Sequence, residues 1–429
     1  MRRLVMVGAL LAAAAAPAAA QDTTAAPPEG VRVVLRYTPG ERPVLIVVPG
    51  PGLDSARAIL RRDLDQSDRF ETVVTPEGTA AASVEVNYPL YRQLGGAFAL
   101  QASGTPRGML VRLHDLRAER ALNEMEVALP APDAAGYRLA VHRVSDEVLR
   151  WITGTPGFAS TRVAYVVEGR VRVVDADGFG DVPVTPDGRR ALSPAWSPDG
   201  LRLAYTDFRE GRGPVLVRDL ATGQEQQVPG TGDALNITPG WTPDGRTIAF
   251  AKVDEGGTNI WTANVAEQCC ATRLTVGRFA DNLSPTYAPD GRRLAFISTR
   301  AGSPQVYVMA ADGTDPEVLV PFDFGATGES NAPEWSPDGG SIIFHRDVRD
   351  GGRQLFVMDV ASRRLKQLTS AGRNEDAAWA PDGRHIVFVS DRSGRRQLWV
   401  LDVESGRIRQ LTFGGNARLP SWSRRPAAP

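Results

Sequence analysis

One short motif recurs along the second half of this sequence and constrains its fold more than any other feature. It joins an aromatic residue, a Ser/Thr/Ala-Pro-Asp-Gly turn and an apolar run, as in AWSPDGLRLAYTDF from Ala195. Successive copies lie 43 to 48 residues apart, and their aromatic residues are Trp196, Trp241, Tyr287, Trp335, Trp379 and, in a truncated last copy, Trp422. A period in this range indicates a repeat architecture.

Each copy contains four strand-like runs. In residues 376–412 these are DAAW, HIVFVS, QLWVLDV and IRQLT, separated by turns that contain Gly and Asp or Ser. A single four-stranded sheet cannot bury both faces, so the copies must stack against one another. Four-stranded sheets that repeat at this period are the blades of a β-propeller.

The truncated copy predicts how the propeller closes. Residues 419–423 supply only the innermost strand of a blade, whereas residues 162–167, 170–178 and 182–185 supply three strands without an inner one. Pairing these two ends makes a sixth blade and removes the exposed sheet edges. We therefore predict a six-bladed propeller with four-stranded blades, closed by both ends of residues 160–429.

The N-terminus has the pattern of an export signal. Arg2 and Arg3 precede an apolar run, and three alanines at 18–20 suit a signal peptidase, which predicts a signal peptide at residues 1–20. The apolar run is shorter than the about 20 residues that a membrane span requires, as is every later one. We expect no direct membrane insertion. The polar, proline-containing residues 21–30 are predicted to form a flexible arm.

Residues 31–155 predict a small α/β domain, so the fold class is mixed. The expected strands are VRVVL at 31–35, a buried apolar strand at 44–49, a strand at 70–74 and alternating strands between 98 and 116. Amphipathic spacing predicts helices at 53–70 and at about 134–152.

Charge and cysteine content narrow the function. The chain has 49 basic and 50 acidic residues, which argues against a nucleic-acid partner held by phosphate attraction. The only cysteines, Cys269 and Cys270, are neighbours and cannot join distant elements. They are interpreted as two incidental thiols or a vicinal bond, with a redox switch or metal ligand as the alternative.

The repeated aspartates, Asp199, Asp244, Asp290, Asp338 and Asp382, occupy one turn position and are interpreted as turn-forming residues rather than metal ligands. Function is therefore sought where the copies differ, in the connections that lead into the inner strands and converge on the channel mouth. These polar connections give the candidate partner-binding residues Asn236, Thr238, Asn282, Leu283, Asn331, Asn374, Glu375 and Asn416. Solvated loops without a partner are the alternative.

The sequence contains little that predicts catalysis. There is no Gly-x-Ser-x-Gly motif, no phosphate-binding loop, and no zinc-ligand spacing among the four histidines. We expect no enzymatic activity, no catalytic residue, no cofactor and no metal. The alternatives are a propeller hydrolase or lyase, or a secreted carbohydrate or peptide binder, that uses the channel mouth.

The chain resembles the TolB family, the periplasmic propeller component of the Tol–Pal cell-envelope system. The resemblance lies in the domain order, in YRLAVHRVSDEVLRWITGTPGFASTRVAYVV at 137–167 and in VRVVLRYTPGERPVLIVVPG at 31–50. It implies a monomeric periplasmic scaffold that supports outer-membrane integrity and cell division. It also implies a Pal-like peptidoglycan-associated lipoprotein at the propeller mouth and a TolA-like partner on the arm, at Val31, Arg32, Val33, Val34 and Leu35.

Overall fold

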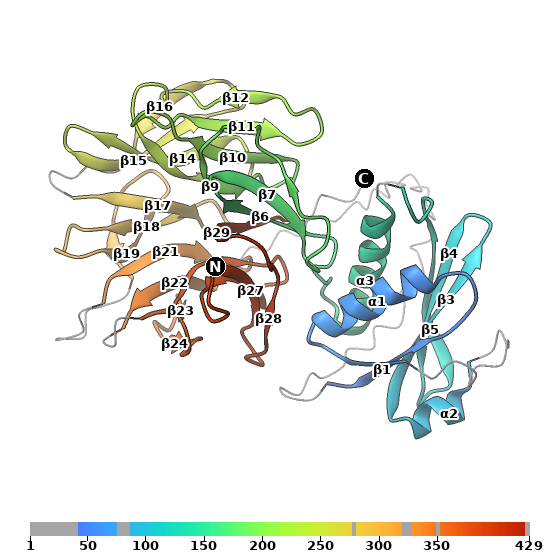
Figure 1. The fold of residues 1–429 in the computed structure, drawn as a ribbon. Helices are drawn as coiled ribbons and strands as arrows, with labels where there is room; N and C mark the ends of the chain where they lie inside the picture. Colours follow the sequence, from blue (N-terminus) through green and yellow to red (C-terminus); the bar gives the residue numbers. More distant parts are fainter. Residues whose placement is uncertain are drawn as a thin grey trace, which may run out of the picture.

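The structure is a computed structural model that describes residues 42–74, 86–134, 136–276, 280–319, 328–348 and 352–424. An α/β domain lies beside a larger body made only of strands (Figure 1). The predicted signal peptide, the arm and the strand at 31–35 lie outside the described residues.

The α/β domain is built on one five-stranded sheet in the order β2-β1-β3-β4-β5. Strand β1 runs parallel to β2 and β3, whereas β3, β4 and β5 are antiparallel neighbours. The elements are β1 Val44–Val48, α1 Asp54–Gln66, β2 Glu71–Val74, α2 Tyr88–Gln93, β3 Gly96–Thr105, β4 Gly108–Asp115, β5 Arg120–Ala128 and α3 Tyr137–Thr153.

Strand β1 is apolar along its whole length because both faces of this sheet are covered. Leu45 packs in a core with Leu60 of α1 and Val144 of α3, and Ile46 packs on the other face with Tyr91 of α2. A strand buried on two sides gives a continuous apolar run rather than an alternating one. The prediction of a buried strand at 44–49 is confirmed, as are the helices that correspond to α1 and α3.

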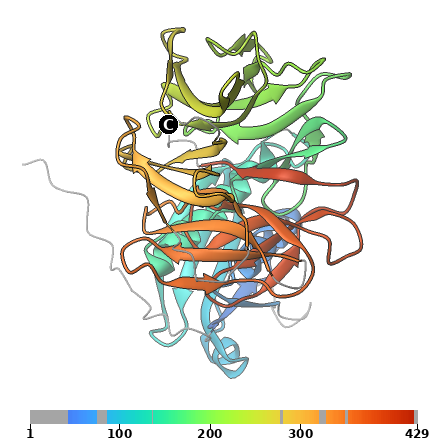
Figure 2. The ribbon, with the colours of Figure 1, turned by 90° about the vertical axis from the view of Figure 1, so that its left-hand side faces the viewer.

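The remaining strands form six four-stranded antiparallel sheets, here called blades 1 to 6, arranged around a common channel (Figures 1 and 2). Blade 1 contains β9 Ala191–Trp196, β10 Arg202–Asp207, β11 Val215–Asp219 and β12 Glu225–Gln227. Blade 2 contains β13 Asn236–Trp241, β14 Thr247–Asp254, β15 Gly257–Asn264 and β16 Cys269–Arg273. Blade 3 contains β17 Asn282–Tyr287, β18 Arg293–Ser298, β19 Gln305–Ala310 and β20 Glu317–Val318.

The last three blades follow the same order from the channel outward. Blade 4 contains β21 Ser330–Trp335, β22 Ser341–Asp347, β23 Arg353–Asp359 and β24 Leu365–Gln367. Blade 5 contains β25 Asn374–Trp379, β26 His385–Ser390, β27 Gln397–Asp402 and β28 Ile408–Gln410. Blade 6 contains β29 Arg418–Trp422, β6 Arg162–Val167, β7 Arg170–Asp175 and β8 Val182–Pro183.

Blade 6 closes the ring as predicted. Its inner strand β29 pairs with β6, so the last described strand of the chain completes a sheet that the first strand of the propeller begins. The backbone N–H of Arg162 also donates to Ser423 Oγ at 2.8 Å. The predicted fold class, a six-bladed propeller behind a small α/β domain, is confirmed.

The repeated motif serves the fold in every blade. In blade 1, Asp199 Oδ1 accepts from the backbone N–H of Leu201 at 2.9 Å, and Gly200 has a left-handed φ of 71° that suits glycine. The aromatic residue packs against the preceding blade, because Trp241 shares a core with Ala204 of blade 1. Its indole N–H donates to the Ala195 carbonyl at 3.1 Å.

The two neighbouring cysteines form a disulfide within β16. This strand is the outermost one of blade 2, and Cys270 is exposed there. The sequence analysis left open whether the cysteines are two thiols or a vicinal bond, and the structure contains the vicinal bond.

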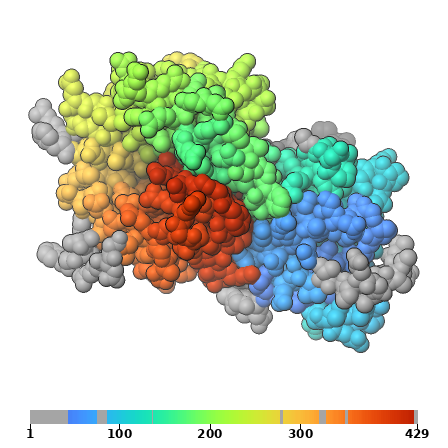
Figure 3. Space-filling view, viewed as in Figure 1, coloured from blue at the N-terminus to red at the C-terminus, as the bar shows by residue number. Residues whose placement is uncertain are grey.

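The two ends of the ring differ in what covers them. The Pro-Asp-Gly turns mark one end, here called the turn face, and the α/β domain lies against this face at blades 5 and 6 (Figure 3). The other end, where the inner strands begin, is here called the mouth face. The ion pairs described between the α/β domain and the propeller lie at the turn face.

Candidate partner-binding face

The mouth face is made of the loops that lead into the inner strands and of the hairpin loops between second and third strands. The two kinds of loop touch each other across neighbouring blades: Gly213 of blade 1 forms a bridge with Leu235 before blade 2. Both kinds of loop thus open at the end of the channel where the sequence analysis placed the connections into the inner strands.

A polar residue begins the inner strand in blades 2 to 5 and is buried. These residues are Asn236, Asn282, Ser330 and Asn374. Asn236 Nδ2 donates to the carbonyls of Gly213, Thr231 and Ala234 at 2.9 to 3.0 Å, so one side chain joins the two kinds of loop. Buried amides need such hydrogen-bond partners, and these bonds indicate that Asn236 stabilises the loops.

Asn374 repeats this arrangement and adds an arginine. Its Nδ2 donates to Gln354 Oε1 at 2.9 Å and to the Ala371 carbonyl at 3.1 Å. Its Oδ1 accepts from Arg392 Nη2 at 2.9 Å, and that guanidinium lies over the Trp399 ring. Asn282 has the same relation to Arg300. The side chains of Asn374 and Asn282 thus use both ends of their amide groups to hold the loops.

One residue near the start of the inner strand has a left-handed backbone in all six blades, the third residue in blades 1 to 5 and the second in blade 6. The residues are Ser193, Thr238, Ser284, Ala332, Asp376 and Leu419, with φ between 50° and 53°. Each produces a register shift against the second strand. The bulges point toward one another and line a channel cavity of about 190 Å³. Five of the six are followed by proline, so the wall is mostly apolar.

Two carboxyl groups lie in this channel wall. Burial raises the pKa of Glu334 to about 8, and its Oε1 accepts from the backbone N–H of Trp379 at 3.3 Å. Burial and the neighbouring Glu375 raise the pKa of Asp376 to about 6. At neutral pH Glu334 is mainly protonated, so the channel carries less negative charge than its sequence implies.

Glu375 itself is surrounded by arginines at the rim of the channel. Arg353 Nη1 lies 2.7 Å from Glu375 Oε2, and Arg396 Nη2 lies 3.3 Å from Oε1. Arg373 Nε approaches the same carboxylate at 3.7 Å. Glu375 is buried, so its charge is neutralised inside the chain and the arginines form the accessible surface of this part of the rim.

Two apolar side chains project from the mouth loops. Val276 is 86% exposed and Phe413 is 80% exposed. They occupy equivalent positions, because each follows a threonine after the outer strand, in LTV and LTF respectively. They are the two most exposed of the large apolar side chains that the structure describes. The sequence analysis missed both, although alignment of the repeats would have placed them together.

The other predicted site residues are distributed between the channel and the rim. Thr238 lines the channel, and its Oγ1 accepts from the backbone N–H of Ser284 at 3.1 Å. Leu283 is half-buried and packs against the core between blades 3 and 4. Asn331 is half-buried and Asn416 is exposed. The predicted arm residues, Val31 to Leu35, lie outside the described residues.

Groups of side chains that could hold a metal ion lie away from this face. Among the described residues there are two such groups, Asp63-His142-Asp177 and Asp68-His385-Asp402, and both lie between the two domains. The mouth face combines a proline-rich channel wall that also carries Glu334 and Asp376 with rim arginines and projecting apolar side chains. Within the described part of the chain, no helix is long and apolar enough to cross a membrane.

The architecture is that of a six-bladed propeller with four-stranded blades that carries a small α/β domain on its turn face. The model of the TolB beta propeller domain family matches residues 149–321 and 324–427, and the chain belongs to this family. The Tol-Pal system protein TolB of Azoarcus sp. is 35% identical over 188 residues, and that of Methylococcus capsulatus is 33% identical over 187. These matches span about two fifths of this chain and of the relatives.

Solved structures show how widely the fold extends. The crystal structure of TolB from Acinetobacter baumannii has a TM-score of 0.76 and 24% identity, covering 90% of this chain and 97% of that one. A chain of the nidogen/laminin complex has a TM-score of 0.51 and 11% identity, covering 62% of this chain and 98% of that one. At these identities the likeness concerns the fold alone.

Proposed function

We propose that this protein is a non-enzymatic periplasmic scaffold of the Tol–Pal system that binds a Pal-like lipoprotein on its mouth face. The observation that carries the proposal is the family match together with the position of the α/β domain, which leaves the mouth face uncovered. A partner there would cover Val276 and Phe413 and could insert a segment into the channel.

The partner-facing residues of this proposal are those that the loops leave accessible. Thr238 in the channel and Asn331 and Asn416 on the rim remain from the sequence analysis, and Val276 and Phe413 are added. Asn236, Asn282, Asn374 and Glu375 act behind them by fixing loop shape. Leu283 contributes from the core below its loop.

Calorimetric titration of residues 21–429 with the soluble domain of the Pal-like lipoprotein from the same organism tests this proposal. We expect stoichiometric binding with micromolar or tighter affinity. Phe413→Ala should weaken binding about tenfold or more, because burying a phenylalanine side chain in an interface is worth about 1.5–3 kcal/mol. Leu201→Ala is the matched control, because Leu201 is 57% exposed on the turn face.

The outcomes test separately which partner binds and which face of the propeller it binds. No binding by a folded sample would overturn the Pal-like partner. Equal loss of affinity in the Phe413→Ala and Leu201→Ala variants would contradict the assignment to the mouth face.

A TolA-like partner is proposed for the arm, so deletion of residues 21–40 should abolish binding of a TolA-like periplasmic domain. Retained binding by the deletion variant would refute that part.

A further inference from the structure

Two of the four histidines lie between the domains, and the first is on helix α3. His142 Nδ1 lies 2.8 Å from Asp63 Oδ2, and Asp63 is on α1 of the same domain. The other ring nitrogen, Nε2, faces Asp177 Oδ2 of the propeller at 3.8 Å. Ser145 Oγ also donates to Asp63 Oδ2, at 2.6 Å. One imidazole therefore stands between a carboxylate from each domain.

The second histidine has the reciprocal arrangement on the propeller side. His385, at the start of β26, has Nδ1 2.7 Å from Asp382 Oδ2 of its own blade. Its Nε2 lies 3.3 Å from Asp68 Oδ2, which follows α1 in the α/β domain. Phe158, in the segment between the domains, packs on this ring with centroids 4.6 Å apart. Again each domain supplies one carboxylate.

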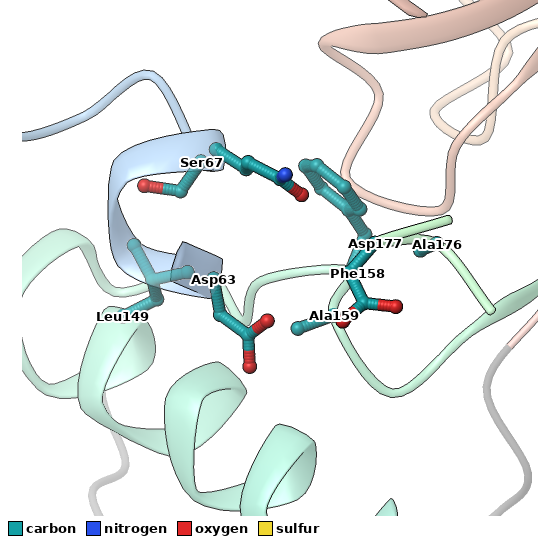
Figure 4. A pocket seen from close by; sticks show the side chains of 8 residues that line it. Asp63, Ser67, Leu149, Phe158, Ala159, Ala176 and Asp177 are labelled. Carbon is teal, nitrogen blue, oxygen red and sulfur yellow. The ribbon is translucent and has the colours of Figure 1, made fainter. Parts of the chain in front are cut away.

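Both imidazoles are sealed from solvent. His142 and His385 are each 1% exposed. The cavity beside them, lined by Asp63 and Leu149 on one side and by Phe158 and Asp177 on the other, has a volume of about 10 Å³ (Figure 4). That volume corresponds to about one water molecule. Charges at such a place are weakly screened, so the protonation state of each ring strongly affects the contact between the domains.

The charged groups around the two rings are closely balanced. Arg138 and Arg62 bind Asp177, Arg384 binds Asp402, and Arg407 Nη1 lies 3.0 Å from Asp68 Oδ1. The α/β domain contributes Arg62, Asp63, Asp68 and Arg69 from α1 and its exit, and Arg138 from α3. The propeller contributes Asp175 at the end of β7 and Asp177 after it, Asp382 and Arg384 before β26, Asp402 at the end of β27, Glu404 and Arg407 in the turn that follows, and Arg409 on β28. Because arginine stays charged, the histidines are the groups in this set best suited to titrate near neutral pH.

We propose that the domain interface is a proton-operated lock. In the locked state the imidazolium of His142 joins Asp63 to Asp177, and that of His385 joins Asp382 to Asp68. Loss of the two protons removes two positive charges from this sealed contact, so that only the arginine pairs still oppose the carboxylates of the two domains, and the α/β domain is held less tightly on the turn face. The lock is independent of the partner proposed for the mouth face.

The direction of titration agrees with this geometry. Burial acts to lower the pKa of His385, but the charge and hydrogen bond of Asp382 and the bond to Asp68 outweigh it and raise the pKa. Burial also acts to lower the pKa of His142, and Asp63 and Asp177 together raise it. In contrast, burial lowers the pKa of His345, away from the interface, to about 4. Raised values in the closed state mean that the lock holds at low pH and opens as pH rises through them.

A divalent metal ion fits these places poorly. An ion between His142 and Asp177 would meet the guanidinium groups of Arg138 and Arg62, which already bind that carboxylate. Asp402 in the other group is likewise held by Arg384. A proton adds one positive charge to each group without displacing an arginine, so protonation of His142 and His385 fits the two groups better than metal binding does.

Energy transfer between dyes on the two domains tests the lock. The dyes are placed at Ser55→Cys on α1 and Ala361→Cys on the turn face of blade 4, in a background with Cys269→Ser and Cys270→Ser. We expect transfer efficiency to change between pH 5.5 and pH 9, with a midpoint above 6.5. Each histidine should change the opening equilibrium by up to about tenfold per pH unit.

Glutamine variants provide the matched controls. Glutamine keeps a hydrogen-bond donor but does not titrate, so His142→Gln with His385→Gln should remove the pH response. His114→Gln, away from the interface, should retain it. A wild-type efficiency that is constant over this range, or a response that survives in the double variant, would overturn the proposal. So would a Zn²⁺-induced closing that is lost in the double variant.

Histidine resonances of the unlabelled, unmutated chain give an independent readout. The proposal requires two of the four imidazoles to titrate above the ordinary value of about 6.5 and to shift together with amide signals of α3. Assignment of both to His114 and His345, or four titrations at or below 6.5, would contradict it without depending on the folding of any variant.

Discussion

At the scale of single residues, the mouth face shows why polarity in a loop does not identify a contact residue. Asn374 stands beside Glu375 in a loop that the repeats mark as variable, yet its side chain binds Gln354 and the carbonyls of its own loop. The Phe413 side chain, which no motif singles out, is the exposed one. Burial separates the two kinds of residue, and it depends on where the neighbouring blade lies.

Asn374→Ala should therefore destabilise the fold rather than act on binding alone. It removes three donated hydrogen bonds and leaves the buried Gln354 Oε1 with one partner fewer, which we expect to cost about 2–4 kcal/mol in the free energy of unfolding. Asn416→Ala, an exposed change of the same type, should cost less than about 0.5 kcal/mol. Urea denaturation of both variants measures the difference, and equal stabilities would contradict the structural role.

The channel carboxyl of Glu334 gives a pH-dependent prediction. Its pKa is about 8 in the folded chain and lower in the unfolded chain, so the folded state binds the extra proton. The associated stability is present at acidic pH and is lost as pH rises toward 8, by up to about 1.4 kcal/mol per pH unit. Glu334→Gln should reduce the pH dependence of the free energy of unfolding between pH 5 and pH 8. Glu126→Gln, at an exposed position of the edge strand β5, should leave this dependence unchanged. A wild-type slope preserved in Glu334→Gln would refute the assignment.

At the scale of elements, the predictable parts of the fold were those with strong patterns. The Pro-Asp-Gly turns and alternating runs predicted the blades, and the continuous apolar run predicted β1. Strand β5, Arg120–Ala128, was missed because it lies at a sheet edge and contains Glu124 and Glu126, which disfavour strands in isolation. Helix α2 was missed because six residues are too few to show a helical period.

The candidate site was predictable only in its location. The repeats placed the variable loops at the channel mouth, and the structure agrees. The left-handed residue before each proline, such as Thr238, could not be predicted, because the bulge is imposed by pairing with the second strand. The same is true of the arginines around Glu375, which come from three separate loops.

The closing strand β29 makes a prediction about whole elements. Truncation after residue 417 removes β29, leaves β6 without an inner neighbour, and deprives Trp196 Nε1 of the Ser421 carbonyl. We expect an aggregation-prone chain with weak near-ultraviolet circular dichroism, because an unpaired strand edge and an apolar core are exposed. Truncation after residue 424 keeps β29 and is the control. A monomeric, native-like product from the shorter chain would show that the ring does not need this strand.

At the scale of the whole molecule, the two domains are joined by charge and by aromatic contacts, of which those of Phe158 are buried. Phe158 is buried, and its ring lies 5.4 Å from that of Trp422 in the closing strand as well as against His385. The same side chain thus supports the ring closure and the contact between domains. The α/β domain is consequently positioned by the blades that close the ring.

Phe158→Ala should weaken both the closure of the ring and the contact between the domains. Loss of a buried phenylalanine is expected to cost about 3–5 kcal/mol, and the two domains should no longer unfold in one transition. Phe413→Ala, at an exposed position, should change the free energy of unfolding by less than about 0.5 kcal/mol. Calorimetric scanning measures both effects. A single transition of unchanged midpoint in Phe158→Ala would contradict this role.

The closing strand also determines when the propeller can be completed during synthesis. Arg162 begins β6 and binds Ser423, 261 positions later, so blade 6 stays incomplete until nearly the whole propeller has left the ribosome. Blade 6 is therefore the last blade that can be completed during synthesis, and the ring stays open until then. The closed ring thus indicates that the chain was synthesised to its last strand, whereas a chain interrupted before β29 is expected to remain open.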